Sequence, residues 1–202
     1  MTSVIENPSE SSGLSLAVRL QQDSSNAWRE LVELYGPLVA SWARRTGLDE
    51  AATEDVTQET FLSVHRSIDQ FDPTVPNATF RGWLWRITRN AVLQSIRKPH
   101  PEAHGGSTAN ARLAELPDPL TQELSKDEPP STPDDTTALV NRAMRQIESL
   151  VEPTTWQAFL RTTVGGESST DVAESLGLTP AAVRKAKSRT LQRLRKQLGD
   201  LI

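Results

Sequence analysis

Apolar side chains recur along most of the chain at intervals of three and four residues, the spacing of an amphipathic helix. In the first half of the sequence this spacing predicts helices over residues 26–45, 49–70 and 79–98. Gly47 marks the end of the first of these, and Pro37 inside it predicts a kink or a split. No stretch shows the alternation of apolar and polar positions, bounded by turn residues, that indicates a strand.

The second half continues the helical pattern after an interruption. Helices are predicted over residues 137–150, directly after Pro153, and as a final pair between residues 169 and 198. The interruption, residues 99–138, holds seven prolines, too many for a continuous helix or sheet. The sequence therefore predicts an all-α chain with two small helical domains, residues 1–98 and 139–202, joined by a flexible acidic linker.

The charge is distributed unevenly along the 202 residues, whose formal net charge is −4. Residues 1–98 carry a net charge of −2, residues 99–138 carry −6, and residues 139–202 carry +4. Two stretches, 73–98 and 181–198, contain five and seven basic residues and no acidic one. An acidic total is therefore compatible with nucleic acid as a partner.

Composition excludes several classes of function. The chain has no cysteine, so disulfides and thiolate chemistry are ruled out. Its three histidines, His65, His100 and His104, belong to no metalloprotease, serine-hydrolase or P-loop motif. We expect no catalytic residue, no metal site and no cofactor. The first residues lack the basic and apolar segments of a secretory signal, and no run is long enough to span a bilayer, so we expect a cytoplasmic protein without membrane insertion.

One face of the helix predicted over residues 49–70 is polar around a single leucine. Such a face suits the docking of another protein, but exposed leucines are common, and the spacing alone favours an ordinary solvated surface. The residues of this face are Asp55, Gln58, Glu59 and Leu62.

The helix predicted over residues 79–98 carries tryptophan and arginine outside its apolar stripe and has no acidic residue. Aromatic rings stack on unpaired bases and guanidinium groups bind phosphates, so this pattern suits single-stranded nucleic acid. A helix buried on two sides, with arginines extending past the rings, is an equal alternative. The residues outside the stripe are Trp83, Trp85, Arg86, Arg89, Asn90 and Arg97.

Residues 169–188 have the spacing of a helix-turn-helix. Ala173 permits close approach of two helices, Gly177 suits the left-handed turn between them, and Val183 packs the second helix on the first. Thr179 can cap the second helix and Pro180 suits its first position. The outer face of this second helix carries small, basic and amide side chains. These favour insertion into a major groove over attachment to a protein or membrane surface. That face comprises Ala181, Lys185, Ser188, Arg189, Gln192 and Lys196.

Taken in order, these features resemble the extracytoplasmic-function class of bacterial sigma factors, in the sigma-70 family. The matching stretches are residues 54–62 (EDVTQETFL) and 80–90 (FRGWLWRITRN), which resemble sigma region 2, and the helix-turn-helix of residues 173–195, which resembles region 4. Residues 28–38 (WRELVELYGPL) are also similar to this class.

The resemblance implies a role for each group of residues. The face of Asp55, Gln58, Glu59 and Leu62 is implied to bind the coiled coil of the largest subunit of core RNA polymerase. The implied −10 contacts are Asn77, Thr79, Phe80, Arg81, Trp83, Trp85, Arg86, Arg89, Asn90 and Arg97. The implied −35 contacts are Thr179, Ala181, Arg184, Lys185, Lys187, Ser188, Arg189 and Gln192.

The implied function is promoter recognition and transcription initiation, with core polymerase and promoter DNA as partners and no enzymatic activity. The sequence leaves open whether an anti-sigma factor binds the chain. The loop that would capture a −10 base is unusually stiff, with Pro73, Val75 and Pro76, and leaves the preferred base undecided. The alternative is a stand-alone helix-turn-helix regulator, which would need a sensor or dimerisation domain in place of the tryptophan-arginine helix.

Overall fold

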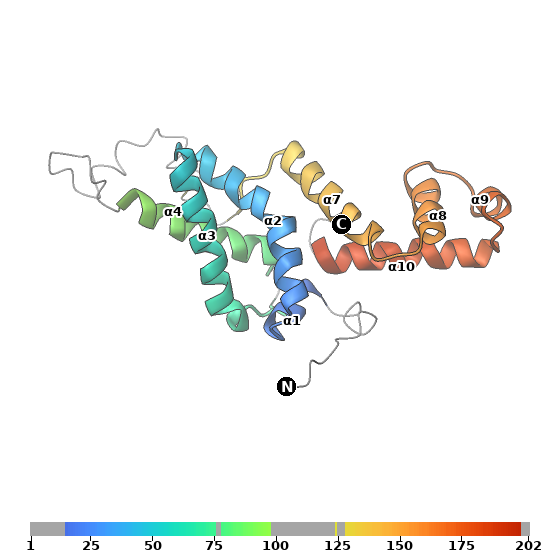
Figure 1. Cartoon of the computed structure of the whole chain (residues 1–202), viewed down its shortest axis with the longest axis horizontal. Coiled ribbons are helices and arrows are strands. Elements are labelled where there is room, and N and C mark those ends of the chain that lie inside the picture. The colour runs from blue at the N-terminus through green and yellow to red at the C-terminus, as the bar shows by residue number, and fades with distance from the viewer. Residues whose placement is uncertain (1–14, 76–77, 98–123, 125–127, 199–202) are drawn as a thin grey trace. The chain divides into compact units, whose positions relative to one another are not determined.

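The computed structural model describes residues 15–75, 78–97, 124 and 128–198, and every element longer than one residue in these ranges is a helix (Figure 1). This confirms the all-α prediction. The chain divides into two compact units, an amino-terminal unit of residues 23–135 and a carboxy-terminal unit of residues 136–202 together with 1–22. The helices are α1 (Leu16–Gln21), α2 (Ser25–Arg45), α3 (Glu50–Ser67), the short 3-10 helix η2 (Ile68–Gln70), α4 (Phe80–Arg97), α7 (Pro133–Glu148), α8 (Pro153–Thr163), α9 (Ser169–Leu176) and α10 (Pro180–Leu198).

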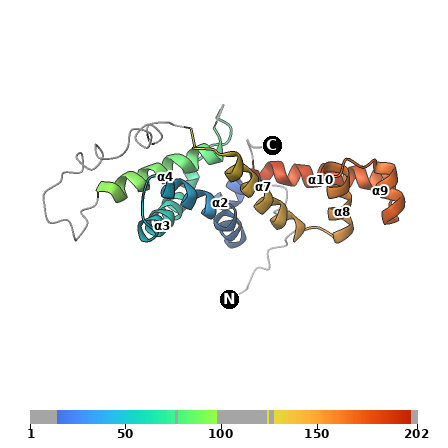
Figure 2. The same cartoon turned by 90° about the horizontal axis from the view of Figure 1, so that it is seen from above.

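The amino-terminal unit is built from α2, α3 and α4, each packed on the other two (Figures 1 and 2). Local capping signals fix the helix ends: Asp49 accepts a hydrogen bond from the Ala52 N–H at the start of α3, and Thr79 accepts one from the Gly82 N–H at the start of α4. Gly47, with φ of 80°, follows the end of α2 as predicted. The apolar stripes of the three helices form one core.

Of the kink or split predicted at Pro37, the split does not occur, because α2 runs unbroken from Ser25 to Arg45. Proline lacks the N–H that would bond to the carbonyl of Glu33 four residues earlier. Pro37 and Glu33 both lie on the exposed side of the helix, where water can satisfy that carbonyl.

Two helix boundaries differ from the predictions. The six-residue helix α1, begun by a Ser15 cap, is too short to give a periodic signal and was not predicted. Helix α7 begins at Pro133, inside the segment expected to be a linker, rather than at Thr137. Thr132 and Asp135 cap it reciprocally and proline suits its first position, so local chemistry overrides the proline-rich composition.

The helix-turn-helix of the carboxy-terminal unit is formed by α9 and α10, with α8 packed against both (Figure 2). Gly177 adopts φ of 66°, and Thr179 accepts a hydrogen bond from the Ala182 N–H, as the sequence predicted. Ala158, Ala173 and Val183 belong to the buried cluster that joins the three helices. Arg161 at the end of α8 forms an ion pair with Glu167 in the α8–α9 turn; hydrogen bonding to Arg161 lowers the pKa of this carboxyl.

Two buried threonines of α3 provide a matched test of polar burial. The hydroxyl of Thr60 donates to the Val56 carbonyl at 2.7 Å, whereas that of Thr53 has no hydrogen-bond partner among the described residues. We expect Thr53→Val to raise the free energy of unfolding by about 1 kcal/mol, because it removes an unpaired buried hydroxyl. Thr60→Val should leave stability unchanged or lower it. Urea denaturation of both variants measures the difference, and equal effects would contradict the expectation.

Candidate nucleic-acid and protein interfaces

The outward face of α3 carries the four residues predicted to bind another protein. Asp55 and Gln58 are exposed, and Leu62 exposes 51% of its surface, unusual for a leucine in a helix whose core stripe is buried. Glu59 is half-buried and already has partners, because its carboxylate accepts hydrogen bonds from Ser63 at 3.2 Å and from Arg66 at 3.3 Å. The face therefore presents the apolar side chain of Leu62 among polar groups, and one of its acids, Glu59, forms an ion pair with Arg66 of the same helix.

Arg66 was missed by the sequence analysis, although its position seven residues after Glu59 places the two on one side of a helix. A hollow between α3 and α4 begins beside this pair. Its lining comprises Glu59, Ser63, Ile87, Asn90, Ala91 and Gln94. It joins the predicted protein-binding face of α3 to the predicted nucleic-acid face of α4.

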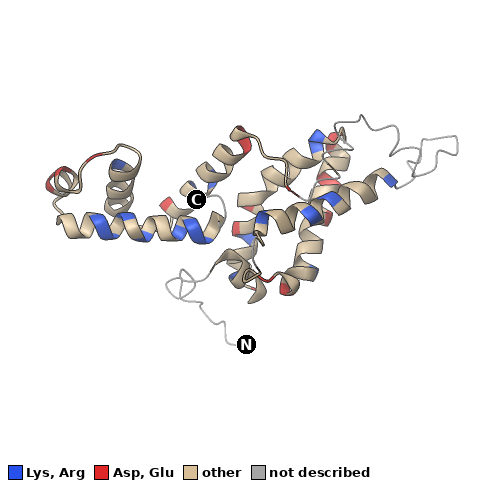
Figure 3. Ribbon diagram, turned by 180° about the vertical axis from the view of Figure 1, so that it is seen from behind, with Lys and Arg blue, Asp and Glu red and all other residues tan. Residues whose placement is uncertain are grey.

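The structure divides the predicted −10 residues of α4 into an exposed group and a buried group. Arg86, Asn90 and Arg97 are exposed, and Trp83 and Arg89 are half-buried. Basic bands along α4 are visible in Figure 3. These five residues keep at least part of their surface exposed.

Trp85 is not available for base stacking, contrary to the prediction. It exposes 1% of its surface and packs edge-to-face on Trp42, with ring centroids 5.4 Å apart and an interplanar angle of 71°. The reason is that α4 packs on both α2 and α3, so its buried side is wider than one apolar stripe. The two-sided burial that the sequence left as an alternative applies to Trp85, and Arg81 is similarly buried, with 6% exposed.

Aromatic rings from Phe71, which follows η2, and from the start of α4 form a cluster. The rings of Phe71 and Phe80 pack edge-to-face with their centroids 5.5 Å apart, and the centroids of the Trp83 and Phe71 rings are 5.4 Å apart. Phe71 was missed because it stands alone outside the periodic helices. Asp72 accepts hydrogen bonds from the hydroxyl and the N–H of Thr74, which lower the pKa of its carboxyl and hold the turn closed.

Two further predicted −10 residues, Asn77 and Thr79, belong to the loop before α4. Thr79 is half-buried and caps α4 through its hydroxyl, and Asn77 lies outside the described residues. The Thr79 hydroxyl is therefore already engaged in a hydrogen bond to the backbone of α4.

The outer face of α10 is basic along most of its length (Figure 3). Seven of the eight predicted −35 residues are exposed, and Lys187 is the exception. The Lys187 ammonium donates a hydrogen bond to the Thr162 carbonyl at 3.2 Å, near the carboxyl end of α8, where a cation is favoured. The exposed seven are Thr179, Ala181, Arg184, Lys185, Ser188, Arg189 and Gln192.

No group of three or more histidine, cysteine, aspartate or glutamate side chains among the described residues could hold a metal ion. His100 and His104 lie outside these residues. None of the helices in the described part of the chain is long and apolar enough to cross a membrane.

Comparison with known proteins gives a consistent result. The family described as Sigma-70 region 2 matches residues 31–100. The RNA polymerase sigma factor CarQ of Myxococcus xanthus is 26% identical over 91% of this chain and 95% of its own length. The ECF RNA polymerase sigma factor SigE of Mycolicibacterium smegmatis is 29% identical over 88% of this chain, which spans 64% of that relative. The ECF sigma factor SigW of Bacillus subtilis is 29% identical over 42% of this chain and 43% of its own length.

The two tryptophans of α4 should differ in their contribution to stability. We expect Trp85→Ala to lower the free energy of unfolding by about 3–5 kcal/mol, because it leaves a large cavity against Trp42. Trp83→Ala should cost clearly less, because the Trp83 ring is only half-buried. Chemical denaturation of each variant tests this, with Trp85→Phe as the substitute should the alanine variant not fold. A larger loss at Trp83 would contradict the assignment.

Proposed function

We propose that the chain is a sigma factor of the extracytoplasmic-function group of the sigma-70 family. In this role it binds core RNA polymerase, recognises the −10 and −35 promoter elements and directs transcription initiation. One observation carries the proposal. A sigma region 2 match over residues 31–100 is followed on the same chain by a helix-turn-helix with a basic outer face.

Polymerase binding is assigned to the outward face of α3. Leu62 offers an exposed apolar contact, and Asp55 and Gln58 surround it with groups that can pair with a basic or polar partner. The coiled coil of the largest polymerase subunit is the partner that the family resemblance implies. Because Glu59 is held by Arg66, its engagement by polymerase exchanges one ion pair for another.

Recognition of the −10 element is assigned to α4 and the loop before it. Arg86 and Arg97 can hold the phosphates of a separating strand, and Trp83 offers half of its ring for stacking. Extruding a base costs a few kcal/mol of lost stacking, which contacts in this region would offset. The −35 element is assigned to the outer face of α10, placed in the major groove.

Because both DNA-binding units lie on one chain, binding of one unit to its promoter element raises the effective concentration of the other unit near the second element. The combined affinity then exceeds that of either unit alone. No bond-making chemistry is assigned to this chain, because polymerase performs it. The protein is proposed to act in the cytoplasm, in a complex with core polymerase on promoter DNA. A stand-alone regulator is not favoured, because it leaves the region 2 match without a role.

Capture by core polymerase tests the assignment of α3. We expect the wild-type protein to be retained by immobilised bacterial core polymerase, and the double variant Asp55→Ala, Glu59→Ala to lose most of that retention. A double variant with the same charge change, Glu148→Ala, Glu174→Ala, alters exposed acids of the other unit and should bind like wild type. Arg66→Gln separates the loss of the Glu59 ion pair from the loss of the acid. Equal capture of all variants would remove α3 from the polymerase interface.

The outer face of α10 is tested with duplexes that carry single base-pair changes in the −35 element of a promoter the holoenzyme transcribes. Lys185→Ala and Arg189→Ala should each weaken binding by about 1–3 kcal/mol and relax discrimination at one position. Lys187→Met should instead lower the free energy of unfolding, because Lys187 is bonded to α8. A loss that is equal across all duplexes would make Lys185 and Arg189 phosphate contacts rather than base contacts.

A further inference from the structure

The hollow between α3 and α4 is a small polar recess with a single acid in its wall. Its volume is about 160 Å³. A cavity of about 150 Å³ holds a benzene molecule, so the hollow is large enough for the flat end of one large side chain. Among the described residues that line it there is one acid, Glu59, and no basic residue.

Glu59 keeps one carboxylate oxygen without a partner on its own chain. Ser63 and Arg66 both donate to Oε1, at 3.2 and 3.3 Å. No hydrogen bond or ion pair to Oε2 is formed within the described part of the chain. The side chain is only 42% exposed. A partly buried carboxylate oxygen of this kind is best satisfied by a donor that also carries positive charge.

The rest of the lining supplies further acceptors and apolar surface. Asn90 and Gln94 are exposed and lie about one turn apart on α4, and each side-chain amide has a carbonyl oxygen. Ile87 and Ala91 add apolar surface. An arginine side chain matches this set, because its planar guanidinium has five N–H donors and its methylene stem packs on apolar groups. Lysine has three donors on one atom and cannot reach acceptors on two helices as well.

The hollow adjoins the face of α3 assigned to polymerase. Glu59 belongs to both, and Ser63 in the lining directly follows Leu62, which exposes 51% of its surface. Asp55 lies four residues before Glu59 and so occupies the same side of the helix. A protein that covers Leu62 therefore brings its neighbouring side chains to the mouth of the hollow.

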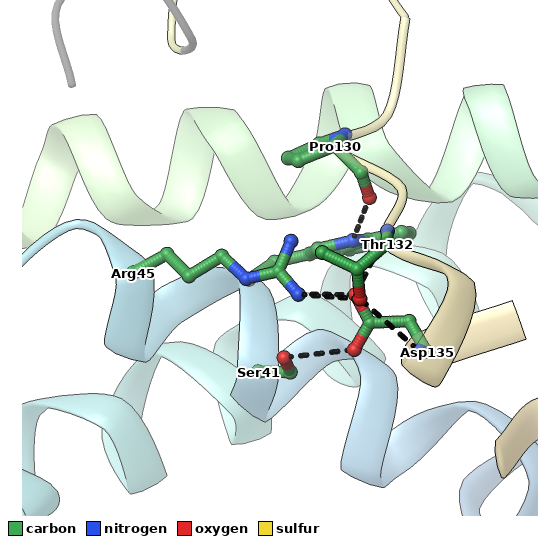
Figure 4. A network of polar contacts seen from close by, with 6 residues as sticks. Ser41, Arg45, Pro130, Thr132 and Asp135 are labelled. Atoms are coloured by element: carbon green, nitrogen blue, oxygen red, sulfur yellow. Dashed lines mark hydrogen bonds and ion pairs between the residues drawn. The ribbon is translucent and has the colours of Figure 1, made fainter. Parts of the chain in front are cut away.

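Contacts with α2 hold α4 in place before any partner binds. Trp85 of α4 packs on Trp42 of α2, and the Trp42 indole N–H donates a hydrogen bond of 2.9 Å to the Pro130 carbonyl (Figure 4). Asp135 fastens the same segment to α2 through an ion pair with Arg45. A site that is formed in advance loses less conformational freedom on binding, which favours affinity.

An unpaired base is the competing occupant of the hollow, because its edge can form hydrogen bonds with the two amides of α4. A nucleotide also brings a phosphate. Glu59 and Asp55 place two negative charges at the hollow, against one positive charge from Arg66. These charges repel phosphate and attract a guanidinium, so the electrostatics favour arginine.

We infer that the hollow receives one arginine side chain of core RNA polymerase, held by Glu59 of α3 and by Asn90 and Gln94 of α4. The inference rests on the proposed function, in which polymerase docks on α3. It extends the polymerase interface to a second helix and gives a binding role to Gln94, which the sequence analysis did not single out. Asn90 also belongs to the exposed set of α4, so polymerase and −10 DNA meet at this residue.

The first experiment measures the Kd of the full-length protein for core polymerase in the absence of DNA. Gln94→Met and Asn90→Leu keep the size of the side chain but remove its amide. Each should raise Kd about tenfold, because a hydrogen bond to a charged group is lost. Gln157→Met, the same replacement of an exposed glutamine on α8, should bind like wild type. Unchanged affinity of both α4 variants would overturn the inference.

A double-mutant cycle tests whether Glu59 and Gln94 hold the same side chain of polymerase. The combination of Glu59→Gln and Gln94→Met should raise Kd by less than the product of the two single effects, by a factor of about three or more. Single effects that simply multiply would show that the two residues bind different groups, which contradicts the inference.

Photocrosslinking identifies the occupant. Because the chain has no cysteine, Gln94→Cys and the control Gln157→Cys can each carry a single photoactivatable thiol label. The label at position 94 should crosslink to a polymerase peptide that contains arginine, and replacing that arginine by alanine should remove the effect of Gln94→Met on Kd. Crosslinking to promoter DNA alone would make the hollow a nucleotide site and overturn the inference.

The same binding measurements separate this inference from the proposed function. If the wild-type protein does not bind core polymerase, the proposed function fails and the inference fails with it. If the wild type binds, Asp55→Ala, Glu59→Ala does not, and both Gln94→Met and Asn90→Leu bind normally, the proposed function stands and only the inference is refuted.

Discussion

The burial of Trp42 determines the arrangement of the amino-terminal unit. Its ring packs against Trp85 and so places α4 on α2, and its indole N–H binds the Pro130 carbonyl and so places the start of α7. A buried indole N–H needs an acceptor, and here the acceptor comes from a segment 88 residues away in sequence. One side chain therefore links the core, the helix assigned to −10 DNA and the segment that begins α7.

The packing of α4 on two helices limits its functional surface. Because Trp85 and Arg81 are buried, the surface of α4 to which we assign −10 recognition is a narrow strip that includes Arg86, Asn90 and Arg97. This strip borders the hollow lined by Glu59 on α3. The face of α3 assigned to polymerase and the strip of α4 assigned to DNA are thus neighbours on two helices that pack on each other.

Local signals predicted most of the fold. Asp49 and Thr79 cap the helices that directly follow them, and Gly177 forms the turn that directly follows α9. The sequence therefore predicted the ends of α2, α3 and α4 to within a few residues, and also the turn before α10. The failures came from contacts distant in sequence. A helical wheel cannot show that a second helix covers Trp85, or that Lys187 reaches the carbonyl of Thr162 in α8. The early start of α7 was a local signal, the cap at Thr132, that the surrounding prolines obscured.

The inward attachment of Lys187 has an evolutionary consequence for α10. It couples the helix to α8 through a residue that does not lie on the exposed face, while Ala181, Ser188 and Gln192 point away from the buried cluster. Scaffold and reading face are therefore encoded by separate positions of one helix. If the exposed face reads the −35 element as we propose, substitutions on it can change the preferred promoter while the fold keeps its stability, and a duplicated copy of such a gene can acquire a new regulon by a few surface replacements.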